Sequence, residues 1–153
     1  MYQKTVGFVQ AIKMGFNRFL SISGRSSRSE FWWWYLFIVI ISYLVTIPAL
    51  SPLFSDPTAF ATAANPTELY AKMFAALGTG SSLALFLLWI FEILAMVPIT
   101  CRRLHDTGRG AGWFFISFVP FIGGIWLFIL LLLPSEPQTN RFGEIPNLAE
   151  NGW

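Results

Sequence analysis

The segment CRRLHDTGRGAGW, residues 101–113, concentrates the residue types in this chain that are most able to do chemistry, and it lies between two apolar runs. Its histidine and aspartate, His105 and Asp106, could supply a general base and the carboxylate that orients it. Its three arginines could instead bind a phosphate, because a guanidinium donates two parallel hydrogen bonds to phosphate oxygens. The third interpretation is a charged hinge that only orients the neighbouring segments in a membrane.

Three apolar runs are long enough to cross a bilayer as helices. Residues 31–50, 81–100 and 113–133 each match the ~20 residues needed to span ~30 Å of hydrocarbon. The chain is also 55% hydrophobic and only 12% charged, against roughly 25% charged in soluble domains. The sequence therefore predicts an all-α integral membrane protein with three transmembrane helices. Pro120 and Gly123–Gly124 interrupt the third run and leave open a re-entrant hairpin in its place.

Basic residues alternate between the segments that flank these runs. Five lie before the first run, one in the linker 51–80, three in the loop 101–112 and one in the tail 134–153. Cytoplasmic loops of membrane proteins carry the excess of Lys and Arg. We therefore expect the N-terminal segment 1–30 and the Arg-rich loop to face the cytoplasm, with the linker outside. Three full spans would place the tail outside, whereas a hairpin would return it to the cytoplasm.

Two further helices are expected outside the apolar runs. Before the first run, apolar residues recur at helical spacing at Val9, Ile12, Phe16, Phe19 and Leu20. This pattern predicts a short amphipathic helix that either lies at the membrane interface, in the headgroup layer, or packs on the spans. In the linker, Asn65 and Pro66 form a typical helix start and Gly78 a typical helix end. We expect that second helix to lie on the outer surface.

Five arginines gather at the predicted cytoplasmic ends of the apolar runs: Arg25, Arg28, Arg102, Arg103 and Arg109. Basic pockets between spans on that side suit the phosphate of an anionic lipid headgroup. The alternative is that these arginines only orient the spans, with ion pairs to Glu30 and Asp106. The expected partners are membrane lipids, anionic ones above all, or a membrane-protein partner or a second copy of the chain. No feature of the sequence favours a nucleic acid.

Metal and catalytic sites have less support in the sequence. The chain has one histidine and one cysteine, too few for a multi-histidine or cysteine-rich zinc site. The Gly-x-Ser-x-Gly elbow, the Walker loop and the dinucleotide-binding fingerprint are absent from it. In a short loop, a pair such as His105 and Asp106 more often caps helix ends than acts as a general base. We therefore expect no metal, no cofactor and no catalytic residue, in a non-enzymatic protein. The less favoured alternative is a membrane enzyme that acts on a phosphate-bearing lipid through His105 and Asp106.

Glu92 is the one carboxylate inside a predicted span. A charge at that depth is costly, so such a side chain is protonated, paired or turned toward a polar cavity. One interpretation is a small homo-oligomeric transporter or channel that uses Glu92; the other is a bond to a neighbouring helix or a position near an interface. Trp32–Trp34 and Trp113 open the first and third runs, as expected of an aromatic belt at the membrane surface.

Three separated segments are similar to one known family. They are GRSSRSEFWWW from Gly24, RRLHDTGRGAGWFF from Arg102 followed by VPFIGG, and LLLPSEPQTNRFGEIP from Leu131. Together and in this order, they resemble the YhaH-like family of small bacterial inner-membrane proteins, a domain of unknown function. The resemblance extends over residues 16–146. It implies a multi-pass protein of the bacterial inner membrane and carries no biochemical activity with it.

The resemblance also marks motif residues other than the five arginines: Gly24, Glu30, His105, Asp106, Trp113, Pro120, Asn140, Arg141 and Gly143. The chain departs from the family pattern at residues 109–113, which are one residue longer than usual and lack a serine. The linker 51–80 is particular to this protein. A hairpin in the third run would bring Arg141 to the cytoplasmic arginines, so the topology bears directly on any headgroup site.

Overall fold

Helices make up the regular structure of this chain. The computed structural model describes residues 5–55 and 61–146, and no strand occurs in those ranges. The chain divides into a first unit, Met1–Phe37 with Leu94–Trp153, and a second unit, Ile38–Ile93. The predicted all-α fold is confirmed. Parts of the predicted N-terminal segment, linker and tail lie outside the described residues.

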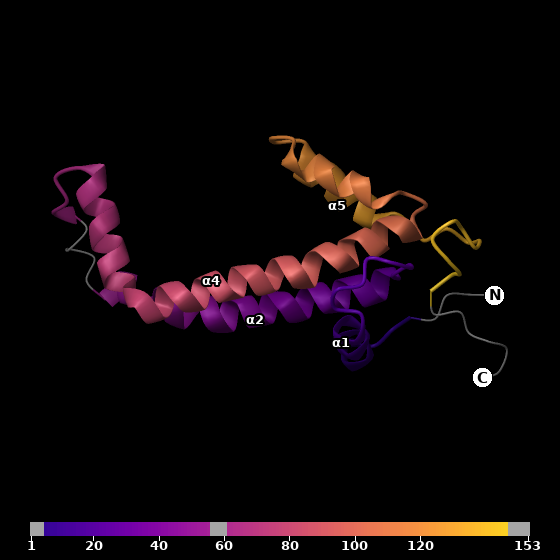
Figure 1. Cartoon of the computed structure of the whole chain (residues 1–153), viewed down its shortest axis with the longest axis horizontal. Helices are drawn as coiled ribbons and strands as arrows, with labels where there is room; N and C mark the ends of the chain where they lie inside the picture. The colour runs from indigo at the N-terminus through magenta and orange to yellow at the C-terminus, as the bar shows by residue number, and fades with distance from the viewer. Residues whose placement is uncertain (1–4, 56–60, 147–153) are drawn as a thin grey trace. The chain divides into compact units, whose positions relative to one another are not determined.

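Two long helices contain most of the apolar sequence (Figure 1). Helix α2 spans Arg28–Ser55 and helix α4 spans Pro66–Asp106. Both exceed the ~20 residues that cross a hydrocarbon core, and both are apolar enough to do so. They contain the predicted spans 31–50 and 81–100. In the first unit the two helices are in contact, because the Trp34 indole donates a hydrogen bond to the carbonyl of Ala95 at 3.1 Å.

Helix α4 contains a break at Gly78, where φ is 66° and ψ is 172°. Glycine adopts such a backbone conformation without steric cost. The first turn of α4 is capped reciprocally: Asn65 Oδ1 accepts from the N–H of Glu68 at 2.8 Å, and Glu68 Oε2 accepts from the N–H of Ala64 at 2.9 Å. The helix predicted from Asn65–Pro66 to Gly78 is therefore present, and it joins the second long helix without a loop.

A short helix, α1, spans Phe8–Asn17 and packs on the start of α2. Its Gly15 lies against the Trp34 ring so closely that a Cβ there would be 2.1 Å from a ring carbon. The Phe16 ring meets the same indole edge-on, with centroids 5.2 Å apart. Val9 remains 65% exposed on another side of α1. The helix predicted before the first run is thus confirmed, and part of its apolar surface is used in packing on α2.

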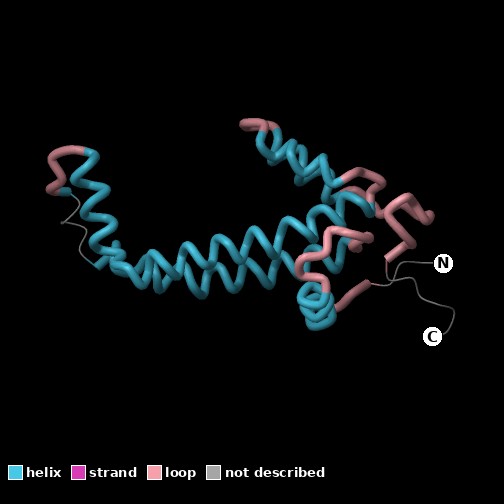
Figure 2. Tube along the Cα trace, in the orientation of Figure 1, coloured by secondary structure: helices cyan, strands magenta, loops and turns pink. Residues whose placement is uncertain are grey.

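The third apolar run forms a helical hairpin in place of one span (Figure 2). A 3-10 helix, η1, spans Ala111–Phe118, and an α-helix, α5, spans Gly123–Leu132. The two pack against each other. The ten residues of α5 cover about 15 Å at 1.5 Å per residue, half the thickness of a hydrocarbon core. In place of one continuous helix over residues 113–133, the structure has two shorter helices, which is the arrangement of the hairpin alternative.

Local geometry explains the turn of this hairpin. Phe121 has a φ of 64°, a left-handed conformation that β-carbon-bearing residues adopt rarely. Gly123 begins α5 so close to η1 that a Cβ would lie 1.9 Å from the carbonyl oxygen of Ile116. Pro120 lies between η1 and α5 in the sequence. A proline cannot continue a regular helix without loss of a backbone hydrogen bond. Proline and glycine therefore break the run where the sequence showed an interruption.

Candidate functional site

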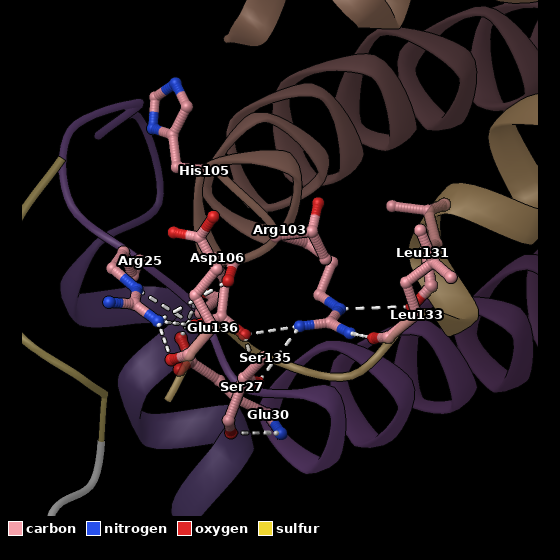
Figure 3. Close-up of polar contacts among 12 residues, drawn as sticks. Arg25, Ser27, Glu30, Arg103, His105, Asp106, Leu131, Leu133, Ser135 and Glu136 are labelled. Atoms are coloured by element: carbon pink, nitrogen blue, oxygen red, sulfur yellow. Dashed lines mark hydrogen bonds and ion pairs between the residues drawn. The ribbon is translucent and has the colours of Figure 1, made fainter. Parts of the chain in front are cut away.

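The charged residues of segment 101–113 meet Arg25 and the chain after α5 inside the first unit (Figure 3). We call this set the buried arginine cluster: Arg25, Arg102, Arg103, Asp106 and Glu30. Asp106, the last residue of α4, is 0% exposed. Its Oδ1 accepts from Arg25 Nε at 3.0 Å, and its Oδ2 accepts from Arg103 Nη1 and from the Ser135 hydroxyl. Two buried cations therefore share one buried anion.

Backbone carbonyls accept from the remaining N–H groups of these two arginines. Arg25 donates to the carbonyls of Glu136 at 2.8 Å and Gln138 at 2.7 Å. Arg103 Nε donates to the carbonyl of Leu131 at 3.1 Å. The last carbonyls of a helix have no partner within it, so the end of α5 offers Arg103 a free acceptor. The two guanidiniums thereby fix the chain where it leaves the hairpin.

Arg102 serves the segment that precedes α2. Its Nη1 donates to the carbonyl of Arg18 at 2.8 Å, and its Nε donates to Ser26 Oγ at 3.1 Å. The Ser26 hydroxyl donates in turn to Glu30 Oε1 at 2.9 Å. Arg102 Nη2 lies 3.9 Å from the same oxygen. The other carboxylate oxygen, Glu30 Oε2, is buried and has no hydrogen-bond partner among the described residues.

Burial dominates the electrostatics of this cluster, whose charged groups lie outside the predicted spans 31–50 and 81–100. Loss of solvation lowers the pKa of Arg103 to about 10, although nearby Asp106 favours the charged form. Burial likewise raises the pKa of Glu30 above its ordinary value of 4.5. A buried charge is stable only when counter-charges and hydrogen bonds replace the hydration that it has lost. The carbonyls and Asp106 do so for the arginines.

The buried arginine cluster includes three of the five arginines predicted as a phosphate site. These three are at most 3% exposed, and their guanidiniums donate to groups within the chain. The alternative ion pairs to Glu30 and Asp106 are formed. Arg28 is exposed, and Arg109 is half-buried with Nη1 donating to the Thr107 carbonyl at 3.1 Å. Only these last two remain open to a phosphate.

His105 and Asp106 do not form a base and carboxylate pair. His105 Nδ1 lies 3.1 Å from the carbonyl oxygen of Gly24, and its ring stacks on Phe142 with centroids 3.9 Å apart. Asp106 faces the arginines, and the two side chains point in different directions (Figure 3). The geometry therefore assigns His105 to holding two turns against the end of α4. Gly24 itself has a φ of 86°, which suits glycine.

The predicted turn around Gly143 docks on the same helix end. Asn140 Nδ2 donates to the carbonyl of His105 at 2.9 Å and to Glu136 Oε2 at 2.7 Å. The N–H of Glu136 donates to the carbonyl of Asp106 at 2.9 Å. Asn140 and Gly143 exchange a pair of backbone hydrogen bonds at 3.1 and 3.0 Å. The motif residues of the tail thus complete the C-terminal cap of α4.

Sequence reasoning missed three participants, Ser135, Glu136 and Phe142. Each belongs to the third motif segment, LLLPSEPQTNRFGEIP, which was the available signal. The sequence spacing gives no further guidance, since Ser135 and its partner Asp106 are 29 residues apart. The contacts depend on the hairpin, which returns the tail to α4.

An open groove of about 440 Å³ lies at the base of the hairpin. It is lined by Gly110, Gly112, Trp113, Ile116 and Arg141. The Arg141 side chain is exposed, and its guanidinium carbon lies 4.7 Å from the centroid of the Phe142 ring. Arg141 makes no hydrogen bond or ion pair within residues 5–55 and 61–146. The hairpin therefore brings Arg141 to the Arg-rich loop, as expected for this topology. We call this feature the hairpin groove.

Glu92 lies in the second unit, half-buried on α4. The Ser42 hydroxyl of α2 lies within hydrogen-bond distance of Glu92 Oε1 and 2.8 Å from the carbonyl of Ile38. Of the alternatives for this carboxylate, the bond to a neighbouring helix is therefore formed. In the described part of the chain, no group of three or more His, Cys, Asp or Glu side chains is placed to hold a metal ion.

Comparison with known proteins identifies the family. Residues 19–144 match the family described as "Protein of unknown function (DUF805)". The chain is 28% identical over 133 residues to Inner membrane protein YhaI of Escherichia coli strain K12, across 87% of this chain and 92% of YhaI. It is 39% identical over 62 residues to Inner membrane protein YhaH of the same strain, across 39% of this chain and 51% of YhaH. No solved structure matches. The chain belongs to the DUF805 family, whose matched region contains the buried arginine cluster and the hairpin.

Proposed function

We propose that this chain is a non-enzymatic integral protein of the bacterial inner membrane that binds an anionic lipid headgroup in the hairpin groove. The names of the relatives and the two long apolar helices support the location. The distribution of basic residues supports a cytoplasmic N-terminal segment and Arg-rich loop. The hairpin adds the tail to that side, so two spans and one re-entrant element make up the proposed topology.

The observation that carries this proposal is the guanidinium of Arg141 at the hairpin groove, which lies over the Phe142 ring and has no hydrogen bond or ion pair among the described residues. Arg109 adds a second cation next to the groove in sequence, and its Nη1 alone is used in a hydrogen bond. Gly110 and Gly112 add no side chains of their own to the groove, and nothing lies within 4 Å of a Cβ built at Gly112. A phosphate accepts well from guanidinium forks. The groove thus combines positive charge with open space.

The hairpin supports the lipid source of that phosphate. Its apolar side chains are largely uncovered: Phe115 is 68% exposed, Phe118 71%, Phe121 95% and Ile125 65%. Apolar surface of this extent is favourable in hydrocarbon and costly in water. Insertion of the hairpin into the bilayer would place its base, with Trp113, at the interface where tryptophan is preferred. The hairpin groove would then lie at the depth of the headgroups.

The buried arginine cluster has a different task in this proposal. The guanidiniums of Arg25 and Arg103 donate to Asp106 and to backbone carbonyls at the end of α5 and after it, so they hold the base of the hairpin against α4. They are therefore positioning residues for the groove. In this proposal the buried arginines position the hairpin groove, and the exposed arginines bind the headgroup.

Native mass spectrometry of protein released from mixed vesicles of phosphatidylglycerol and phosphatidylcholine tests the proposal. We expect the wild type to retain phosphatidylglycerol in preference, and the double variant Arg109→Gln/Arg141→Gln to lose that preference. Lys72→Gln is the matched control, because Lys72 is a basic residue of the linker helix, ion-paired with Glu68 and not among the residues that line the hairpin groove. Equal retention by the double variant and the wild type would overturn the assignment to the hairpin groove.

A further inference from the structure

A second cavity in the first unit involves none of the residues of the hairpin groove. It has a volume of about 300 Å³ and lies among α1, the segment before α2 and the turn after Gly143. Its walls include Met14, Arg18, Gly24, Glu30, Glu144 and Ile145. We call it the Glu30 cavity.

Glu30 is one of the residues that line this cavity, and one of its carboxylate oxygens is buried without a partner among the described residues. The residue is 0% exposed, and its Oε1 accepts from the Ser26 hydroxyl at 2.9 Å. Its Oε2 has no hydrogen-bond partner in the described parts of the chain. Arg102 Nη2 lies 3.9 Å from the other oxygen, Oε1. Buried polar atoms without a partner are rare and costly, so a ligand that donates to Oε2 would recover free energy.

The walls of the Glu30 cavity also carry exposed charged side chains of both signs, and the charge of Arg18 acts on the Glu30 carboxylate. Arg18 is exposed, and its guanidinium makes no hydrogen bond or ion pair to any residue that the structure describes. The exposed carboxylate of Glu144 is equally without a partner there. The guanidinium of Arg25, by contrast, is occupied by Asp106 and the tail carbonyls. The cavity therefore offers two carboxylates for a donor and one arginine for an anion.

We infer that the Glu30 cavity binds the headgroup of a zwitterionic lipid, a primary ammonium joined by two carbons to a phosphate. The ammonium has three donors, enough for Glu30 Oε2 and the Glu144 carboxylate together. The phosphate accepts from the Arg18 guanidinium. A quaternary ammonium has no donor and cannot satisfy Glu30. This inference concerns other residues than the hairpin groove and does not rest on the proposed function.

A membrane source for this ligand is favoured by the neighbours of Arg18 in the sequence. Phe16 is 51% exposed, Leu20 67% and Ile22 52%. These side chains supply apolar surface beside the arginine on which acyl chains can pack. A free aminoethyl phosphate has no acyl chains that could pack on these side chains. The lipid is therefore the expected source, and the soluble compound is a separate arm of the test.

The test is lipid retention measured by native mass spectrometry on the full chain, released from vesicles that contain equal amounts of phosphatidylethanolamine and phosphatidylcholine. The headgroups of these lipids differ only at the nitrogen, where three methyl groups in phosphatidylcholine replace the three hydrogen-bond donors of the ammonium. We expect the wild type to retain phosphatidylethanolamine about tenfold in preference, because a hydrogen bond to a charged group is worth at least that factor. Glu30→Gln, Glu144→Gln and Arg18→Gln should each reduce the ratio severalfold.

Two features keep this test decisive. First, Glu144 and Arg18 are exposed, so their variants should fold even if Glu30→Gln does not. Second, Lys13→Gln on α1 is a matched control, because Lys13 is exposed and does not line the cavity. A ratio near one in the wild type, or a preference unchanged in both exposed variants, would overturn the inference. Binding of free phosphoethanolamine without retention of the lipid would overturn the membrane source.

Discussion

Arginines occupy two environments in the first unit of this protein. In the buried arginine cluster, Arg25 and Arg103 are almost without solvent contact and donate to Asp106 and to backbone carbonyls. At the hairpin groove, Arg141 is exposed and unpaired within the described ranges. The residue type is the same, but burial separates a structural function from the proposed binding function. A cluster of arginines in the sequence is therefore not in itself a phosphate site.

The largest effect is expected from removal of the anion in the buried cluster. Asp106→Asn would leave Arg25 and Arg103 buried without a counter-charge, which costs about 3–5 kcal/mol of folding free energy. A large fall in the melting temperature of the protein in detergent would report this loss. Glu68→Gln, which removes a surface ion pair to Lys72, should change the melting temperature little. An equal melting temperature for the two variants would contradict the structural function of the cluster.

The packing of η1 against α5 in the hairpin can be disrupted by one substitution at a glycine. In Gly123→Ala the new Cβ would lie 1.9 Å from the carbonyl oxygen of Ile116, so we expect a loss of about 1–3 kcal/mol by overpacking. Gly124→Ala is the matched control, because nothing lies within 4 Å of a Cβ at that position. Thermal unfolding of the pair measures the difference. Equal stability would mean that the close approach of η1 and α5 is absent.

The side of the membrane on which the tail lies can be measured by labelling single cysteines. The proposal requires the tail, with Arg141, to lie on the cytoplasmic side. In a Cys101→Ser background, we expect Thr67→Cys to react with an impermeant maleimide on intact cells. Thr139→Cys, next to the tail turn, should react only after lysis. Both positions are exposed. Labelling of Thr139→Cys from outside would restore the third full span and remove Arg141 from the cytoplasmic groove.

A smaller effect concerns the carboxylate of the buried cluster. Because burial raises the pKa of Glu30 above 4.5, the folded chain holds a proton that the unfolded chain releases. The stabilisation by this proton is complete below pH 4.5 and is lost as the pH rises through the folded-state pKa. Glu30→Gln should flatten this part of the curve of unfolding free energy against pH. An unchanged slope in that window would contradict the burial effect.

Local signals in the sequence predicted most of the helices. The spacing of apolar residues indicated α1, the length of the apolar runs indicated α2 and α4, and Asn65 and Gly78 marked the ends of the linker helix. Each of these signals lies within a few residues of the feature that it predicts. Hydrophobic periodicity and caps act over that range, which is why they could be interpreted from one sequence.

The hairpin and the cluster were beyond such signals. Pro120 and Gly123 permitted a break, but an apolar composition suits a span and a hairpin alike, so the choice depended on packing between η1 and α5. The partners Arg25 and Asp106 are 81 residues apart, and Arg25 and Gln138 are 113 apart. No local rule relates residues at that separation. Surface placement, the ordinary expectation for arginine, was corrected by these contacts for Arg25, Arg102 and Arg103.

The contrast between the two environments is tested most directly by thermal unfolding with and without phosphatidylglycerol, for the wild type and for Arg109→Gln/Arg141→Gln. A ligand that binds only the folded protein raises its melting temperature. We predict that phosphatidylglycerol stabilises the wild type more than phosphatidylcholine does, and that the double variant melts as the wild type does without lipid but gains nothing from phosphatidylglycerol. An equal gain in both proteins would contradict a headgroup site at the hairpin groove.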